Sequence, residues 1–340
     1  MASTVTSPIQ HADTPPLVSL DELEAARERL REVVVRTPLL PSPDLSATLG
    51  ANVRLKCESL QRAGAFKLRG AYNFLSQLDA ETRARGVVTY SSGNHAAGVA
   101  LAGQLLGASV IAVMPVTSPE IKRANVRRFG AHVVLEGYTT VERRARAESM
   151  AAETGRVVVP GFDDRRVMTG HGSIGLEIVE EWPEVDMVLV PCGGGGLLSG
   201  VAAAVKAVRP SARVVGVEPT AAPSMTAALA AGAPVLLERS TTIADGLAAV
   251  RVSELTLAHT QALVERVVTV EEQALRDAAT WLFLREKLVV EFSGAAGVAA
   301  LRAGLLETRG RRIAVVLSGG NIDPSSIREL FADSQPGPSA

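Results

Sequence analysis

Gly64-Ala65-Phe66-Lys67-Leu68-Arg69-Gly70 is the stretch that decides the fold of this 340-residue chain. Residues 53–56 before it predict a strand, and residues 71–75 after it predict a helix. Lys67 is therefore expected near a helix N-terminus, where the helix dipole would lower the pKa of its amine. A partly deprotonated amine can form a Schiff base with a carbonyl compound. A solvated lysine in a first helical turn is the simpler interpretation, so other motifs must decide between the two.

The composition is that of a globular chain of about two domains. Hydrophobic residues make up 47% of it, charged residues 21%, and the net charge is -1, which argues against a nucleic-acid partner. Two cysteines cannot form a disulfide framework. The apolar runs are of strand length, and residues 1–16 lack the apolar core of a signal peptide. We therefore expect a cytoplasmic protein without membrane contact.

Short apolar runs alternate with helical segments from residue 86 onward, which is typical of parallel sheets covered by helices. The predicted strands of one group are residues 87–90, 110–114, 132–135 and 157–159, and those of a second group are residues 187–190, 214–217 and 313–317. We predict an α/β fold of two parallel-sheet domains with flanking helices. The expected units are a large domain of residues 1–85 and 163–332, a small domain of residues 86–162, and a disordered tail of residues 333–340.

Three unusual stretches each follow a predicted strand: Ser91–His95, Cys192–Gly196 and Ser318–Asn321. Ligands of open α/β sheets bind outside the carboxyl ends of the strands. The shared position of the three stretches therefore predicts one common site.

The glycine run Gly193-Gly194-Gly195-Gly196 separates a predicted strand from a predicted helix. Its N–H groups can turn toward an anion at the helix N-terminus. No Gly-Lys-Ser/Thr follows, and the spacing is not Gly-x-Gly-x-x-Gly, so a phosphate monoester fits better than a nucleotide. A flexible turn is the alternative, but four glycines cost backbone entropy with no packing benefit visible in the sequence.

The other two stretches are weaker signals when each is taken alone. Ser91-Ser92-Gly93-Asn94-His95 offers hydroxyls, an amide and helix-start N–H groups for a carboxylate or phenolate, but an ordinary helix cap has the same residues. Ser318 could present a neutral hydroxyl to a ring nitrogen, or belong to a plain strand-ending turn.

In this order along the chain, the four motifs resemble those of the fold type II pyridoxal phosphate enzymes, whose fold is like that of the tryptophan synthase β subunit. The similarity is greater to the threonine dehydratase (threonine ammonia-lyase) and serine racemase branch. Lys56-Cys57-Glu58 and Thr242-Ile243-Ala244-Asp245-Gly246 also fit that branch. The resemblance extends over about residues 18–330.

The resemblance implies a role for each site residue. Lys67 would bind pyridoxal 5'-phosphate as a Schiff base and remove the α-proton of the substrate, and Ser92 lies where a racemase has its second acid–base group. The implied cofactor contacts are Phe66 on a face of the pyridine ring, Asn94 at the phenolic oxygen, the N–H groups of Gly193, Gly194, Gly195, Gly196 and Leu197 at the phosphate, Glu291 near the ring edge and Ser318 at the ring nitrogen. The implied contacts of the substrate carboxylate are Ser91, Ser92, Asn94 and His95.

The same resemblance implies elimination of water from L-threonine and/or L-serine, which gives 2-oxobutanoate or pyruvate plus ammonium, in a homodimer or homotetramer. A neutral hydroxyl opposite the ring nitrogen favours elimination over a long-lived carbanion. Three alternatives stay open: an amino acid racemase, a dehydratase of another 3-hydroxyamino acid (hydroxyaspartate, phenylserine or a hydroxyectoine-pathway intermediate), and a non-catalytic phosphate-binding module.

Glu218 matches a carboxylate of the divalent-cation site of some relatives, but Ser224 replaces the second carboxylate. One carboxylate and a hydroxyl are a poor donor set for Mg²⁺, so we expect no obligatory metal.

Overall fold

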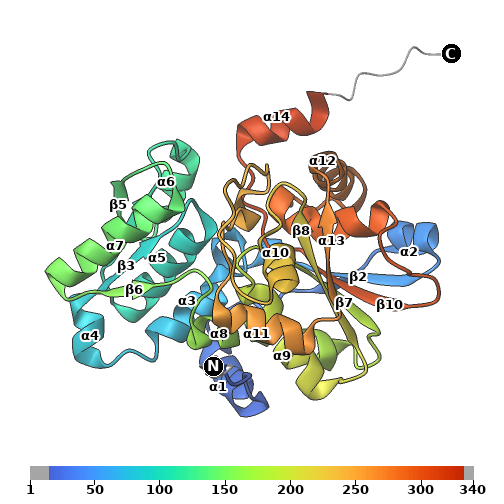
Figure 1. The fold of residues 1–340 in the computed structure, drawn as a ribbon, viewed down its shortest axis with the longest axis horizontal. Coiled ribbons are helices and arrows are strands. Elements are labelled where there is room, and N and C mark those ends of the chain that lie inside the picture. Colours follow the sequence, from blue (N-terminus) through green and yellow to red (C-terminus); the bar gives the residue numbers. More distant parts are fainter. Residues whose placement is uncertain (1–14, 333–340) are drawn as a thin grey trace, which may run out of the picture.

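The computed structural model describes residues 15–332, which form two mainly parallel sheets with helices on both faces of each (Figure 1). The predicted α/β fold with parallel sheets is confirmed. The predicted disordered tail, residues 333–340, lies outside the described residues.

The larger sheet has the strand order β1-β2-β10-β7-β8-β9, and only β1 runs antiparallel to its neighbour. Alternate residues of its central strands point into two apolar layers. Leu189 and Val215 pack with α12 and α13 on one face, and Val188 and Val214 pack with α8 and α9 on the other. The strands are β1 Leu39–Pro41, β2 Asn52–Lys56, β7 Met187–Pro191, β8 Arg213–Pro219, β9 Arg266–Val270 and β10 Arg312–Val316.

The helices around this sheet lie in the N-terminal part and the second half of the chain. They are α1 Leu20–Leu30, α2 Pro43–Leu49, α8 Arg165–Glu181, α9 Gly196–Val208, α10 Ser224–Ala231, α11 Glu254–Leu263, α12 Glu272–Trp281, α13 Phe292–Arg302 and α14 Pro324–Ala332.

The smaller sheet has the order β5-β4-β3-β6 and is parallel throughout. Its strands are β3 Val87–Tyr90, β4 Val110–Met114, β5 His132–Leu135 and β6 Val157–Val159. The helices α5 (Asn94–Leu106) and α6 (Glu120–Arg127) cover one face, and α7 (Thr140–Thr154) packs through Ala147 on the other. The helices α5 and α7 therefore both start at the edge where the strands of this sheet end, and they lie on opposite faces of the sheet.

The helix α3 (Lys67–Leu75) lies between the two sheets and packs on α5 and α8, and α4 (Ala80–Arg85) leads into β3 (Figure 1). Lys67 is its first residue, which agrees with the predicted position near a helix N-terminus. The division of the chain into a large and a small domain at residues 86 and 162 stays a prediction.

The sequence pattern predicts helices over residues 172–181 and 271–287, and both differ from the structure at their ends. The helix expected from Gly172 begins at Arg165, because the Asp164 side chain accepts a hydrogen bond from the Arg166 N–H and caps the helix there. The helix expected over residues 271–287 ends at Trp281 and continues as a π-helical turn, Leu282–Glu286. The strand β9 was absent from the prediction, because its half-buried residues lack a continuous apolar run.

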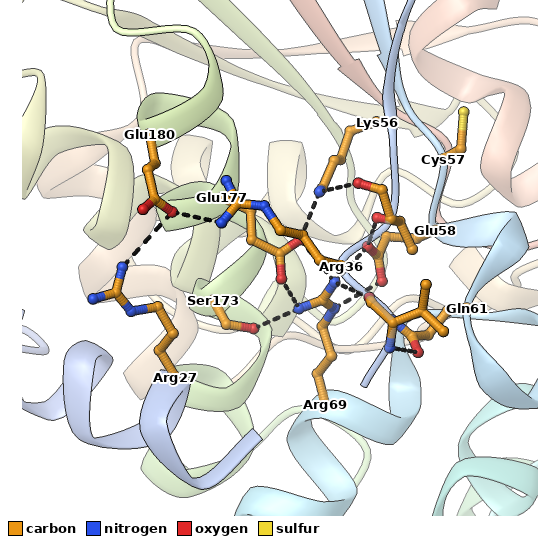
Figure 2. Close-up of polar contacts among 12 residues, drawn as sticks. Arg27, Arg36, Lys56, Cys57, Glu58, Gln61, Arg69, Ser173, Glu177 and Glu180 are labelled. Carbon is orange, nitrogen blue, oxygen red and sulfur yellow. Dashed lines mark hydrogen bonds and ion pairs between the residues drawn. The ribbon is translucent and has the colours of Figure 1, made fainter. Parts of the chain in front are cut away.

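A buried ion cluster joins α3 to α8 and to the end of β2 (Figure 2). Arg69, two residues after Lys67, donates to Glu58 at 2.9 Å and to Glu177 at 2.6 Å, and Lys56 Nζ donates to Glu177 at 2.5 Å. Burial alone would raise the pKa of Glu58, but the charge and hydrogen bonds of Arg69 outweigh it and hold that pKa below its usual value. The cluster holds the start of α3 in place.

Candidate active site

A pocket of about 180 Å³ opens between the two sheets, at the carboxyl ends of their strands. Every site residue that the sequence predicts lines this pocket: Phe66, Lys67, Ser91, Ser92, Asn94, His95, Gly193, Gly194, Gly195, Gly196, Leu197, Glu291 and Ser318. These residues come from five separate parts of the chain, so the fold brings the predicted motifs to one place.

Lys67 points into this pocket, and its amine donates a hydrogen bond to the Gly161 carbonyl at 2.7 Å. The amine lies 5.0 Å from the centre of the Phe66 ring. Burial lowers the pKa of Lys67 to about 8. The expected direction is therefore correct, and burial is a cause that the sequence did not show. The result is a lysine with a substantial neutral fraction near pH 7.

This pKa gives a testable pH dependence for loading of the cofactor that the resemblance implies. Only the neutral amine attacks an aldehyde, and with a pKa of about 8 roughly a tenth of Lys67 is neutral at pH 7. We expect the rate of pyridoxal 5'-phosphate addition to the cofactor-free chain to rise about tenfold from pH 6 to pH 7 and to level off above about pH 8. Rapid mixing followed by Schiff-base absorbance measures it. A rate that keeps rising tenfold per pH unit to pH 10 would contradict the lowered pKa.

The glycine loop is shaped by close packing as well as by backbone freedom. Gly195 has φ +90°, a left-handed conformation that favours glycine. A Cβ at Gly194 would lie 2.3 Å from the Phe162 ring, and one at Gly196 would lie 2.7 Å from Phe162 Cβ. The sequence alone suggested no packing benefit, and this expectation was wrong. The glycine backbone at the N-terminus of α9 lines the pocket, where its N–H groups could bind an anion.

Backbone hydrogen bonds join the Ser318 segment directly to the Lys67 segment. The Phe66 N–H donates to the Ser318 carbonyl at 3.1 Å, and the Gly320 N–H donates to the Gly64 carbonyl at 2.9 Å. The Ser318 side chain is buried and lines the pocket. These backbone bonds fix the spacing between the lysine and the hydroxyl that is expected at the ring nitrogen.

Asn94 is oriented by two side chains. Its amide NH₂ donates to Glu291 at 2.6 Å, and its amide oxygen accepts from Asn321 at 2.9 Å. Burial raises the pKa of Glu291 to about 7, and the charge of Asp245 adds to that effect. Asn321 also donates to the Ala63 carbonyl at 2.8 Å. Sequence reasoning gave Asn321 no role, although it completes the Ser-Gly-Gly-Asn motif. We infer that it sets the direction of the Asn94 amide.

The start of α5 supplies the remaining predicted contacts. Ser91 Oγ accepts from the Gly93 N–H at 3.2 Å, and Ser92 lines the pocket mouth. Burial lowers the pKa of His95 to about 3, so its ring is neutral, and Nε2–H donates to the Val159 carbonyl at 3.1 Å. The other ring nitrogen then has no proton to donate. Contact of His95 with a carboxylate stays a prediction, and its backbone N–H is better suited to it than its ring.

The pocket has further lining residues that the sequence prediction did not include among its site residues. Phe162 packs on the glycine loop, Lys122 of α6 pairs with Asp245 across the two sheets, and Arg143 of α7 reaches the lining. Arg143 and Lys122 lie in strongly charged helices, where the sequence pattern is that of a solvated face. No local signal distinguishes them from exposed residues.

Glu218 binds protein N–H groups. Its carboxylate accepts from the backbone N–H of Met225 at 3.0 Å and of Thr226 at 2.8 Å, at the start of α10. Burial raises its pKa. Within residues 15–332 no group of three or more His, Cys, Asp or Glu side chains is arranged to hold a metal ion. The absence of an obligatory metal stays a prediction.

Comparison with known proteins identifies the class. The family model described as "Pyridoxal-phosphate dependent enzyme" matches residues 30–319, which is most of the chain. The chain belongs to this family, is an enzyme, and uses pyridoxal phosphate. The residues fit the group, because the glycine loop at the N-terminus of α9 and a lysine with a lowered pKa line the same pocket.

Within the family, the chain is similar to ammonia-lyases and racemases. It is 43% identical over 315 residues to an L-threonine ammonia-lyase of Thermotoga maritima, covering 93% of this chain and 78% of that protein. It is 37% identical over 318 residues to an L-threo-3-hydroxyaspartate ammonia-lyase of Saccharomyces cerevisiae, covering 94% and 97%. The structure of maize serine racemase matches with a TM-score of 0.89 and 36% identity, covering 94% and 98%. The predicted branch is confirmed.

None of the helices in the described part of the chain has the length and apolar character needed to cross a membrane.

Proposed function

We propose that this enzyme is an ammonia-lyase that eliminates water from a 3-hydroxyamino acid, with L-threonine and L-serine as the first substrates to test. The products would be 2-oxobutanoate or pyruvate plus ammonium. One observation carries the proposal: Lys67, whose amine has a lowered pKa, lines the same pocket as the glycine loop and Ser318. The similarity to threonine ammonia-lyases adds support.

The bound cofactor would supply an electron sink for the α-carbon. Lys67 would hold it covalently and afterwards accept the α-proton, and the N–H groups from Gly193 to Leu197 would bind its phosphate. The neutral hydroxyl of Ser318 donates or accepts a hydrogen bond but carries no negative charge, so it would leave a ring nitrogen largely unprotonated. An unprotonated ring nitrogen would favour departure of the β-hydroxyl together with the α-proton.

Substrate orientation would come from the start of α5. Ser91, Ser92 and the N–H groups of the first turn would bind the α-carboxylate, where the helix dipole favours negative charge. Ser92 is also the residue that would deliver a proton from the opposite face in a racemase, so racemisation is the second candidate reaction. Elimination from hydroxyaspartate, phenylserine or a hydroxyectoine-pathway intermediate is the third.

One experiment separates these reactions. The holoenzyme is incubated in parallel with L-threonine, L-serine and L-threo-3-hydroxyaspartate, and ammonium, 2-oxo acid and D-amino acid are measured together. We expect stoichiometric ammonium and 2-oxo acid to exceed D-amino acid from at least one of the three. Predominant formation of D-amino acid would identify a racemase instead, and the absence of turnover on all three would reject the proposed elimination.

The cellular setting is proposed on general grounds. The two buried, unpaired cysteines suit a reducing compartment, so we propose a cytoplasmic enzyme.

We also propose a homodimer or homotetramer, as the family resemblance implies, and the division into a large and a small domain described above. Light scattering of the holoenzyme tests the oligomeric state.

A further inference from the structure

The glycine loop between β7 and α9 has backbone N–H groups without a protein partner. Gly193 and Gly195 are buried, and Gly194 is partly buried. Among residues 15–332, none accepts a hydrogen bond from the N–H of Gly193, Gly194 or Gly195. Since buried N–H groups in proteins are nearly always paired, this loop suits an acceptor that binds from the pocket.

Two buried hydroxyl groups hold the carbonyl groups of the same loop. Thr256 Oγ1 donates to the Gly194 carbonyl at 2.9 Å. Ser224 Oγ donates to the Gly193 carbonyl at 3.4 Å. Thr256 and Ser224 are 0% exposed, and neither lines the pocket. The two hydroxyls therefore lie on the side of the loop that faces away from the pocket.

The planar peptide group links these carbonyl contacts to the N–H groups. In a trans peptide, the C=O and the N–H point in opposite directions. A hydroxyl that holds the Gly194 carbonyl away from the pocket therefore turns the N–H of Gly195 toward it. The contact at the Gly193 carbonyl does the same for the N–H of Gly194. Glycine has no side chain that would fix these directions, so the hydroxyls supply an order that the loop itself lacks.

Thr256 is itself held firmly in place. Its hydroxyl accepts a hydrogen bond from the Ser253 N–H at 3.2 Å, at the start of α11, which leaves the hydroxyl proton for the Gly194 carbonyl. The Ser253 carbonyl is a more distant acceptor, at 3.3 Å. Ser199 Oγ of α9 donates to the Thr256 carbonyl at 3.1 Å. A Cβ at Gly195 would lie 2.8 Å from Thr256 Cβ, so this side chain packs directly on the loop.

Ser224 makes the weaker of the two contacts. It is the first residue of α10, whose start is held by the Glu218 carboxylate. Cys192 Sγ lies 3.6 Å from the same Gly193 carbonyl and is a second weak donor to it. Loss of the Ser224 hydroxyl therefore leaves this carbonyl with a partner, and we expect a smaller effect than from loss of the Thr256 hydroxyl.

We propose that Thr256, supported by Ser224, is a positioning residue that turns the N–H groups of the glycine loop toward the phosphate of pyridoxal 5'-phosphate. Neither side chain touches the phosphate in this arrangement, and each acts through one loop carbonyl. A loop that already has its binding conformation loses less entropy when the phosphate binds, so the hydroxyls raise the affinity for the cofactor. The inference rests on the assignment of the phosphate to this loop, made as part of the proposed function, but not on the reaction that follows.

A binding test compares two aldehydes that differ by one phosphate group. Pyridoxal 5'-phosphate and pyridoxal can both form a Schiff base with Lys67, but only the first has a phosphate for the loop. Each is titrated into the cofactor-free full-length chain, and Schiff-base absorbance gives a dissociation constant. In Thr256→Val, which keeps the side-chain shape and removes the hydroxyl, we expect binding of pyridoxal 5'-phosphate to weaken about tenfold and that of pyridoxal less than about twofold. Ser224→Ala should weaken only the first, by about threefold.

Two further variants serve as controls. Thr256→Ser keeps the hydroxyl and should bind pyridoxal 5'-phosphate within about twofold of the unmodified chain. Thr260→Val makes the same change one turn later in α11, where the hydroxyl donates to the Thr256 carbonyl at 2.8 Å instead of to the loop, and it should bind both aldehydes normally. Circular dichroism checks that each cofactor-free variant folds, and Ser224→Ala carries the test if Thr256→Val does not fold.

The outcomes separate a positioning role from a structural one. Unchanged binding in Thr256→Val, or equal weakening for both aldehydes, would overturn the proposal. If the unmodified chain does not prefer pyridoxal 5'-phosphate to pyridoxal, the assignment of the phosphate to the loop is rejected, and the proposal with it. Absence of ammonium release with intact phosphate-dependent binding would reject only the proposed elimination.

Discussion

Lys67→Ala is expected to lose the covalent cofactor and to lower ammonium release by more than about 1,000-fold, because the same amine would both bind the cofactor and take the α-proton. The absorbance of the Schiff base should disappear. Borohydride reduction of the unmodified enzyme, followed by peptide mass analysis, should place the cofactor on the peptide that contains Lys67, and the variant should show no such label.

The control is Lys206→Ala, which removes a lysine amine that donates to the Pro210 carbonyl on the protein surface. It should keep both the label and the activity. Thermal unfolding of the two variants checks that each folds. If the cofactor colour and ammonium release both survive in Lys67→Ala, the assignment of this site is wrong.

Arg69→Met should cost about 3–5 kcal/mol of unfolding free energy, the largest stability effect that we expect from one substitution. Arg69 is fully buried and, together with Lys56, balances the charges of Glu58 and Glu177 (Figure 2). Without it, two buried carboxylates share the single cation of Lys56. Urea unfolding of the variant and the unmodified chain measures the difference.

Two further variants test the reason for this loss. Arg36→Met removes an exposed ion pair with Glu180 near the same cluster and should cost less than about 1 kcal/mol. Adding Glu58→Gln to Arg69→Met removes one of the stranded charges, so the double variant should recover part of the lost stability. A loss in Arg69→Met no larger than that in Arg36→Met would show that the cluster is not important for stability.

Elements whose signal is local could be predicted from the sequence. The strands of the smaller sheet are short apolar runs bounded by turn residues, and β3, β4, β5 and β6 begin and end where the sequence places them. Elements whose apolar face is set by distant partners could not. The edge strand β9 and the helix α10 are examples, because β9 pairs with β8 and the start of α10 donates hydrogen bonds to Glu218 of β8.

The same division holds for the site. The motif residues were identified because unusual residue types follow strand ends, and the carboxyl ends of parallel strands lie together at one edge of the sheet. The packing of Phe162 on the glycine loop and the Asn321 contact with Asn94 join segments that are far apart in the sequence. The local sequence does not indicate such contacts.

The sequence by itself determined the α/β class, and it predicted Lys67 as the cofactor lysine and a loop that suits a phosphate, because each depends on residue types at short spacing. Only the tertiary structure decided why the pKa of Lys67 is low and that Arg143 lines a pocket instead of a solvated face. Burial is a property of the whole packed chain, and an arginine in a charged helix has the same local sequence whether solvent or a pocket surrounds it.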